Sequence, residues 1–161
     1  MKRILGLAVV VLIIGITIFL NTPKNADNDT TTVEQLITNK NKIEIVAVFV
    51  GQEGTPVEIT TKEEVKELLN LISNVSVKKL SKQEDIDFMS EGQVLLKKGI
   101  FTVQLKEKDI DSEYGFLIIL PEGVIYIVDI DSMHGNKRTI SYLSKSKHPN
   151  IYKWMAGKIG A

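Results

Sequence analysis

The sequence predicts an α+β fold: an antiparallel sheet with one main amphipathic helix on one face and a short C-terminal helix, after an N-terminal transmembrane helix. Three observations lead to this prediction. An apolar run stands near the start of the chain, one later segment has the apolar spacing of a surface helix, and several short β-branched runs follow it. Short connections favour antiparallel pairing, and strands grouped after one helix favour an α+β arrangement.

The apolar run extends from Ile4 to Leu20 and follows the basic residues Lys2 and Arg3. As a helix its 17 residues would span about 25 Å, slightly less than a ~30 Å hydrocarbon core, and the run is longer than the apolar part of most cleaved signals. No charged residue interrupts it, which argues against an amphipathic core helix. We expect a signal anchor at 4–20, a cytoplasmic tip at 1–3 and an extracellular C-terminal domain.

Residues 21–42 are predicted to form a flexible tether, because NTPKNADNDTTT at its start is polar and has no apolar periodicity. Its segment VEQLI, at 33–37, could form one helical turn or dock on the domain. Secretion after signal cleavage is the alternative to an anchor, although Ala26 lacks the small partner of an A-x-A-like site. A single extracytoplasmic domain is expected over 43–161.

The first elements of this domain are predicted to be a strand, a short strand and the main helix. Residues 43–50, IEIVAVFV, have the composition of a buried strand, and VEIT at 57–60 is a short strand or an extended approach. The main helix is predicted at 61–74, where Thr61 and Glu64 have capping-box spacing. Its apolar positions form one stripe, so the helix should lie on a sheet: Val65, Leu68, Leu69 and Ile72.

The remaining elements are mostly strands. Residues 82–92, KQEDIDFMSEG, are predicted to be a loop that Phe88 and Met89 anchor to the core. The runs on either side of Pro121-Glu122-Gly123 indicate a hairpin, and Pro149 suits the first position of a terminal helix docked by Ile151, Trp154 and Met155. The predicted ranges are 75–80, 93–98, 100–106, 114–120, 124–130 and 138–143 for strands, and 150–158 for the helix.

Composition excludes several classes of function. The chain has 20 basic and 20 acidic residues, so removing Lys2 and Arg3 leaves 18 against 20, a net charge of −2 for the outer part. Nucleic acid is therefore not an expected partner, since it requires a concentrated basic surface. The chain has no cysteine, which excludes disulfides, thiol catalysis and zinc–thiolate sites.

Three Asp-Ile-Asp triplets, at 85–87, 109–111 and 129–131, are the most conspicuous polar pattern. Paired carboxylates suit calcium, but in DIDSMHGN Met133 and His134 replace the oxygen ligand and glycine of an EF-hand loop. We interpret each triplet as a strand end that points its isoleucine inward.

Other candidate residues have simple structural interpretations. His134, near Ser132, is interpreted as a turn residue, and His148 as the residue before the terminal helix; no nucleophile-elbow pattern accompanies them. Tyr142, Tyr152 and Trp154 could form an aromatic patch for a partner, although docking of the helix explains Trp154 better. No catalytic, cofactor-binding or metal-ligating residue is therefore predicted.

The arrangement resembles a family of small exported domains of unknown function from Gram-positive bacteria. The resemblance covers residues 43–156 and lies in the first strand at 43–50, the capped helix TTKEEVKELLNLISN and the hairpin GFLIILPEGVIYIV. It implies an N-terminal anchor or lipid signal before a domain of about 100 residues, and no activity or site residue. The missing cysteine excludes lipid attachment and favours a protein anchor.

Together these observations predict a membrane-anchored, non-catalytic binding module. The membrane is its expected partner through residues 4–20, with a protein or cell-envelope component as a second partner and with no cofactor. One alternative is a cell-envelope hydrolase that uses the loop carboxylates of Asp85, Asp87, Asp129 or Asp131. Another is an inhibitor or immunity-type module that blocks a secreted enzyme.

Overall fold

The computed structural model describes residues 29–37, 39–51, 55–91, 94, 98–108, 113–129 and 139–160. These residues form an α+β fold with one antiparallel sheet, as predicted, in the strand order β1-β4-β8-β7-β6-β5-β2-β3. The strands are β1 (Thr30–Thr32), β2 (Ile45–Val50), β3 (Val57–Ile59), β4 (Ser76–Lys79), β5 (Phe101–Lys106), β6 (Glu113–Ile119), β7 (Ile125–Val128) and β8 (Ser141–Ser144). The helices are α2 (Val33–Leu36), the 3₁₀ helix η1 (Lys40–Lys42), α3 (Lys62–Ser73), α4 (Lys82–Glu91) and α6 (Pro149–Ile159).

The predicted membrane segment at 4–20 lies outside the described residues. Among the helices that are described, none is long and apolar enough to cross a bilayer.

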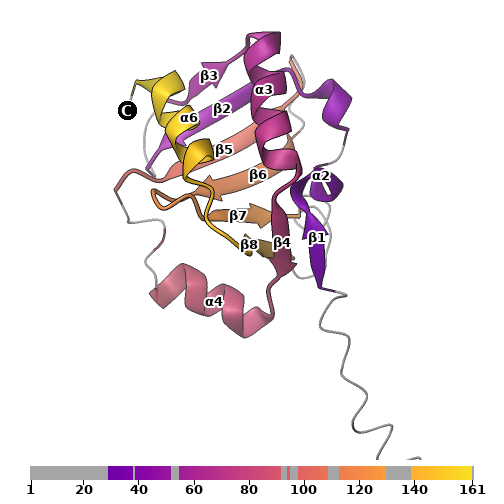
Figure 1. The fold of residues 1–161 in the computed structure, drawn as a ribbon, viewed down its shortest axis with the longest axis vertical. Coiled ribbons are helices and arrows are strands. Elements are labelled where there is room, and N and C mark those ends of the chain that lie inside the picture. Colours follow the sequence, from indigo (N-terminus) through magenta and orange to yellow (C-terminus); the bar gives the residue numbers. More distant parts are fainter. Residues whose placement is uncertain are drawn as a thin grey trace, which may run out of the picture.

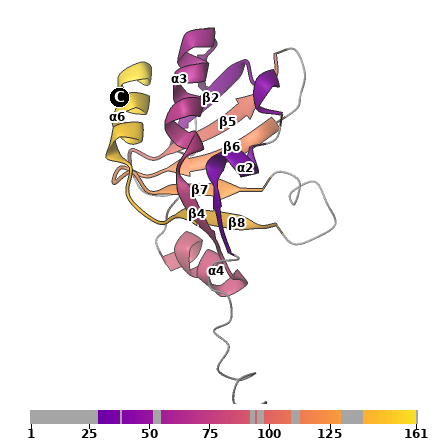
Figure 2. The same cartoon turned by 45° about the vertical axis from the view of Figure 1, so that its right-hand side comes forward.

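Helices α3 and α6 cover one face of the sheet, which we call the α3–α6 face (Figures 1 and 2). The predicted apolar stripe of α3 is buried, and Ile151 and Met155 of α6 are at most 1% exposed. They pack on inward side chains of the central strands, such as Val103, Leu117 and Ile127. Both helix predictions, including the docking of α6, are thus confirmed.

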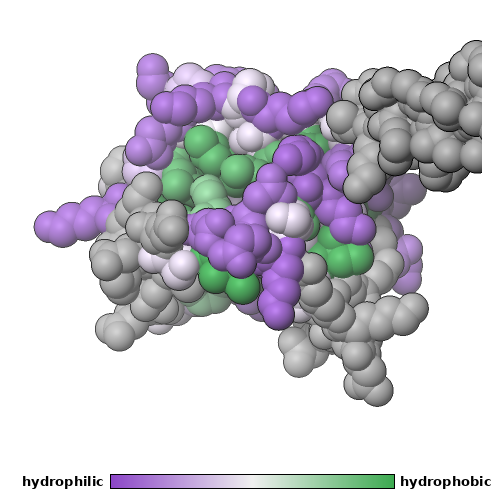
Figure 3. Space-filling model, turned by 90° about the horizontal axis from the view of Figure 1, so that it is seen from below, coloured by the Kyte–Doolittle hydropathy of each residue, from purple (hydrophilic) through white to green (hydrophobic). Residues whose placement is uncertain are grey.

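Helix α4 covers part of the opposite face, the α4 face, and corrects the prediction of a loop at 82–92. The side chains that alternate with those of the α3–α6 face form a second apolar cluster there, including Ile118 and Tyr126. Phe88 and Met89 of α4 pack against this cluster, so their predicted anchoring role is confirmed. Figure 3 shows this end of the molecule, with apolar surface on both sides of a hydrophilic band.

The segment expected to be a tether is partly folded. Strand β1 pairs with β4, with Thr30 opposite Lys78 and Thr32 opposite Ser76. Val33 follows at the start of α2, is fully buried, and donates its backbone N–H to the Val75 carbonyl at 3.0 Å. The described fold therefore includes residues from Thr30 onward, whereas we expected the domain to begin at residue 43.

The other strand predictions hold with shifted ends, apart from 93–98. Of that range only Val94 and Lys98 are described, and neither belongs to a strand. The hairpin is confirmed, since β6 and β7 pair antiparallel around Gly123, whose φ is 79°. The strand predicted at 138–143 is β8, which begins at Ser141.

Thr61 precedes α3 at the N-cap, but its side chain makes no capping hydrogen bond to the backbone. Glu64 instead pairs with Lys158 of α6 at 2.7 Å, and this hydrogen bond is the main cause that lowers the pKa of Glu64. Lys158 also lies 5.3 Å from the centre of the Trp154 ring, a cation–π contact. The ion pair links the outer surfaces of the two helices on the α3–α6 face, whereas the cation–π contact lies within α6.

Among the described glycines, Gly123 has the closest neighbours, because the hairpin turn lies directly against the start of α6. Its carbonyl accepts the His148 N–H at 2.8 Å. A Cβ at this position would lie 2.3 Å from the carbonyl carbon of His148 and 2.5 Å from the Pro149 nitrogen. Backbone atoms cannot yield as a flexible side chain does, and the positive φ adds strain.

We predict that Gly123→Ala destabilises the protein by about 2 kcal/mol or more, through backbone displacement and strain. Gly157→Ala is the matched control, because Gly157 is helical and nothing lies within 4 Å of an added Cβ. Alanine there should stabilise α6 by about 0.5–1 kcal/mol. Urea unfolding followed by the fluorescence of Trp154, the single tryptophan, measures both changes. Equal effects of the two substitutions would contradict the proposed contact.

Candidate functional site

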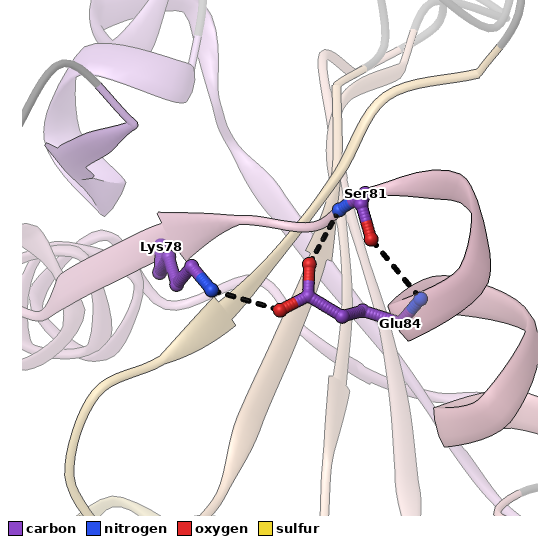
Figure 4. A network of polar contacts seen from close by, with 3 residues as sticks. All are labelled: Lys78, Ser81 and Glu84. Carbon is purple, nitrogen blue, oxygen red and sulfur yellow. Dashed lines mark hydrogen bonds and ion pairs between the residues drawn. The ribbon is translucent and has the colours of Figure 1, made fainter. Parts of the chain in front are cut away.

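The junction of β4 with α4 carries a network of polar contacts, shown in Figure 4. The Ser81 N–H donates to Glu84 Oε2 at 2.8 Å, and the Glu84 N–H donates to Ser81 Oγ at 3.2 Å. This reciprocal pair is a capping box at the start of α4. Lys78 of β4 donates to the other carboxylate oxygen, Glu84 Oε1, at 2.8 Å. We call Lys78, Ser81 and Glu84 the α4 clasp.

The α4 clasp favours the ionised form of Glu84. The hydrogen bond from Lys78, followed by that from the Ser81 backbone, lowers the pKa of Glu84 to about 2. Both partners are well exposed, so the ion pair is screened by solvent and orients α4 more than it stabilises the fold. The sequence SKQE carries this S-x-x-E signal, which the prediction of a loop missed.

Tyr126 of β7 holds the middle of α4. Its hydroxyl donates to Asp85 Oδ1 at 2.9 Å and lies 2.8 Å from Ser141 Oγ, which is itself buried. The ring of Phe88 stacks on Tyr126, with centroids 5.4 Å apart. Burial, with the bond to Asp85, raises the pKa of Tyr126 to about 12, so the hydroxyl remains a donor at physiological pH.

A shallow pocket of about 320 Å³ lies beside the α4 clasp, where β4 and β8 meet. The lining combines charged groups with two leucines and one hydroxyl: Lys78, Leu80, Glu84, Leu143, Ser144 and Lys145. Strand pairing brings these residues together, since Lys78 lies opposite Leu143 and Val77 opposite Ser144. Sequence reasoning missed this pocket because β4 and β8 are far apart in the chain.

The candidate carboxylates of Asp85 and Asp87 make separate contacts on α4. Asp85 contacts Tyr126, whereas Asp87 accepts a hydrogen bond from Gln83 at 2.6 Å along the exposed side of α4. Residues two apart on a helix do not face each other, so these two do not form a facing pair. Ile86 between them is 46% exposed, which corrects the interpretation of this triplet as a strand end.

The other two triplets are described only in part. Asp129 directly follows β7, as expected of a strand end, whereas Asp109, Asp111 and Asp131 lie outside the described residues. Among the residues that are described, no three acidic or histidine side chains gather closely enough to hold a metal ion.

Of the two histidines, His134 also lies outside the described residues, with Ser132. His148 is the N-cap residue of α6, as interpreted from the sequence. Its Nε2 lies 3.2 Å from Ser146 Oγ, a neighbour two residues away on the exposed surface.

The three candidate aromatic side chains pack against the core. Tyr152 stacks on Phe101 with centroids 4.8 Å apart, and its hydroxyl donates to the Gly99 carbonyl at 2.8 Å. Tyr142 and Trp154 are partly buried against the same cluster. Docking of α6 thus explains Trp154, as we expected.

The β3 end of the sheet is a second surface of interest. In the described part of the chain, β3 pairs with β2 on one side and with no strand on the other. Val57 of β3 is 41% exposed and lies opposite Val48 of β2. Val50, two residues further along β2, is 47% exposed. An unpaired strand edge beside exposed apolar side chains is a surface on which an extended segment can pair.

Comparison with family models, with curated proteins and with solved structures found no match for this chain.

We predict that the α4 clasp contributes to stability in full above about pH 4.5 and loses its contribution between pH 4.5 and about 2. The sign follows from the lowered pKa of Glu84. As the pH falls, Glu84 is protonated in the unfolded chain before it is protonated in the folded protein, and this shifts the equilibrium toward the unfolded state. Glu84→Gln should therefore flatten the pH dependence of urea unfolding in this window. Glu58→Gln, an exposed acid on β3 and outside any helix, is the control and should flatten the dependence less than Glu84→Gln does.

We predict that Tyr126→Phe costs about 1–2 kcal/mol, because buried Ser141 loses its hydroxyl partner and Asp85 its donor. Tyr142→Phe is the control, because the Tyr142 hydroxyl makes no hydrogen bond to a described residue; its expected cost is below about 0.5 kcal/mol. Hydrogen exchange should also show α4 opening more often in Tyr126→Phe. Unchanged exchange of α4 would contradict its attachment through Tyr126.

Proposed function

We propose that this chain is a single-pass membrane protein that presents a non-catalytic binding domain outside the cell and pairs its β3 edge with an extended segment of a protein partner. The observation that supports this proposal best is the β3 end of the sheet, where Val50 and Val57 are exposed and where no described strand pairs with the outer edge of β3. The apolar run at 4–20 and the basic residues before it support the anchor.

The chemistry of the β3 edge favours a different protein over a second copy of this chain. Glu58, at the centre of β3, is exposed. Antiparallel pairing of two β3 strands about their centres would place the two Glu58 carboxylates opposite each other, which is unfavourable. A partner strand with a basic or neutral residue opposite Glu58 avoids this repulsion, and an apolar neighbour can cover Val57.

We predict that Val57→Lys abolishes recovery of the partner in a crosslinking pull-down from intact cells that express the full-length protein. A lysine at the edge hinders strand addition while leaving the core untouched. Ile86→Lys is the matched control, because Ile86 is similarly exposed but lies on α4. It should retain the partner.

The two variants distinguish a partner bound at the β3 edge from one bound at α4. One partner lost with Val57→Lys supports strand addition, and a secreted enzyme as that partner would identify an inhibitor. Loss of the partner with Ile86→Lys alone would move the binding surface to α4 and refute pairing at β3.

A further inference from the structure

The pocket between β4, β8 and α4 has an excess of positive charge. Of its three charged groups, Lys78 and Glu84 pair with each other, so Lys145 supplies the excess. Glu84 is already engaged on both oxygens, by Lys78 and by the Ser81 N–H. The Lys145 ammonium donates to Thr30 Oγ1 at 3.2 Å and forms no ion pair with a described residue.

The two ammonium groups retain hydrogen-bond donors for a ligand. Each carries three N–H donors, of which the contacts above use one. Leu80 and Leu143 add apolar surface to the same pocket, and both belong to the cluster on the α4 face. A ligand that combines an anionic group with an apolar body matches this lining.

The length of chain before β1 limits how far this pocket can lie from the predicted membrane segment. Thr30, which contacts Lys145 and pairs with Lys78, begins the first described strand. Only residues 21–29 separate it from the apolar run that ends at Leu20. Nine residues span at most about 30 Å, so an anchored chain keeps the β1 and β4 end of the domain close to the bilayer surface.

We infer that this pocket binds the phosphate group of an anionic lipid headgroup, with Lys78 and Lys145 on the phosphate and the leucines against the glycerol region. This inference rests on the proposed membrane anchor for the source of the phosphate, but not for the chemistry of the pocket. Lysine ammonium groups bind phosphate as point charges, without the fixed geometry that arginine imposes.

The test measures how fast each lysine of the full-length protein is acylated, by mass spectrometry, in lipid nanodiscs of two compositions. Discs that contain phosphatidylglycerol should slow acylation of Lys145 and Lys78 about threefold relative to pure phosphatidylcholine, as expected for a site about two-thirds occupied. Exposed Lys147 controls for the general effect of an anionic surface nearby. Lys62, at the far end of the domain where α3 begins, controls for the reagent (Figure 1).

Two Lys145 variants and a measurement with inorganic phosphate distinguish a lipid headgroup from free phosphate as the ligand. Lys145→Gln should remove the lipid-dependent protection of Lys78, and Lys145→Arg should retain it. Inorganic phosphate is added to phosphatidylcholine discs in the second arm. Protection there alone would support the phosphate site but overturn the lipid as its source.

Equal acylation of Lys145 in every condition, or equal slowing of Lys147, would overturn the site. Alkaline carbonate extraction of the same protein from cell membranes reports on anchoring separately. Failure of the anchor is therefore distinguishable from failure of the pocket.

Discussion

The central strands β6 and β7 are buried on both faces of the sheet, and the rest of the fold depends on this constraint. Leu117 and Ile119 face α3 and α6, whereas Ile118 between them joins the cluster on the α4 face. A strand with apolar side chains on both faces is stable only when each face is removed from water. The sheet therefore requires a cover on its second face, and α4 provides part of it.

Helix α4 suits this role although its sequence is mostly polar. It contributes two half-buried apolar residues, Phe88 and Met89, and the Asp85 carboxylate, which accepts a partly buried hydrogen bond from the Tyr126 hydroxyl. The α4 clasp then sets where the helix begins. The same arrangement places Lys78 and Lys145 at the edge of the covered area, where they line the proposed phosphate pocket.

The β3 end is at the opposite limit of the sheet. Figure 1 places β3 at the far end of the molecule from α4 and β1. If the short segment 21–29 holds the β1 end near a membrane, the β3 edge points away from it. The two proposed surfaces are thus separated by the width of the sheet, one toward lipid and one toward a protein partner.

The sequence predicted the elements whose signals are local. Helix α3 has one apolar stripe, the β6–β7 hairpin has a Pro-Glu-Gly turn, and α6 has Pro149 at its first position. Helix α4 was missed because its residues show little apolar periodicity, and its stability depends on Tyr126, which is 41 residues away from Asp85. Strand β1 consists of three threonines and is a strand because it pairs with β4.

The candidate sites likewise depend on contacts between distant residues more than on local sequence patterns. Asp-Ile-Asp is a visible pattern, yet at 85–87 it lies on a helix with Ile86 outward. The pocket lysines carry no local signal, because Lys78 and Lys145 come to line one pocket only through pairing of the non-consecutive strands β4 and β8. The exposed edge of β3 likewise depends on strand order, which short segments of sequence do not specify.

Hydrogen exchange of the full-length protein, resolved by peptide, tests the central constraint most directly. If two-sided burial of β6 and β7 holds the fold together, their amides exchange slowest and only through global unfolding, while α4 and β3 open at lower free energy. Exchange of β6 and β7 as fast as that of β3 would contradict this account, because it would show that covering both faces of the sheet is not what stabilises the domain.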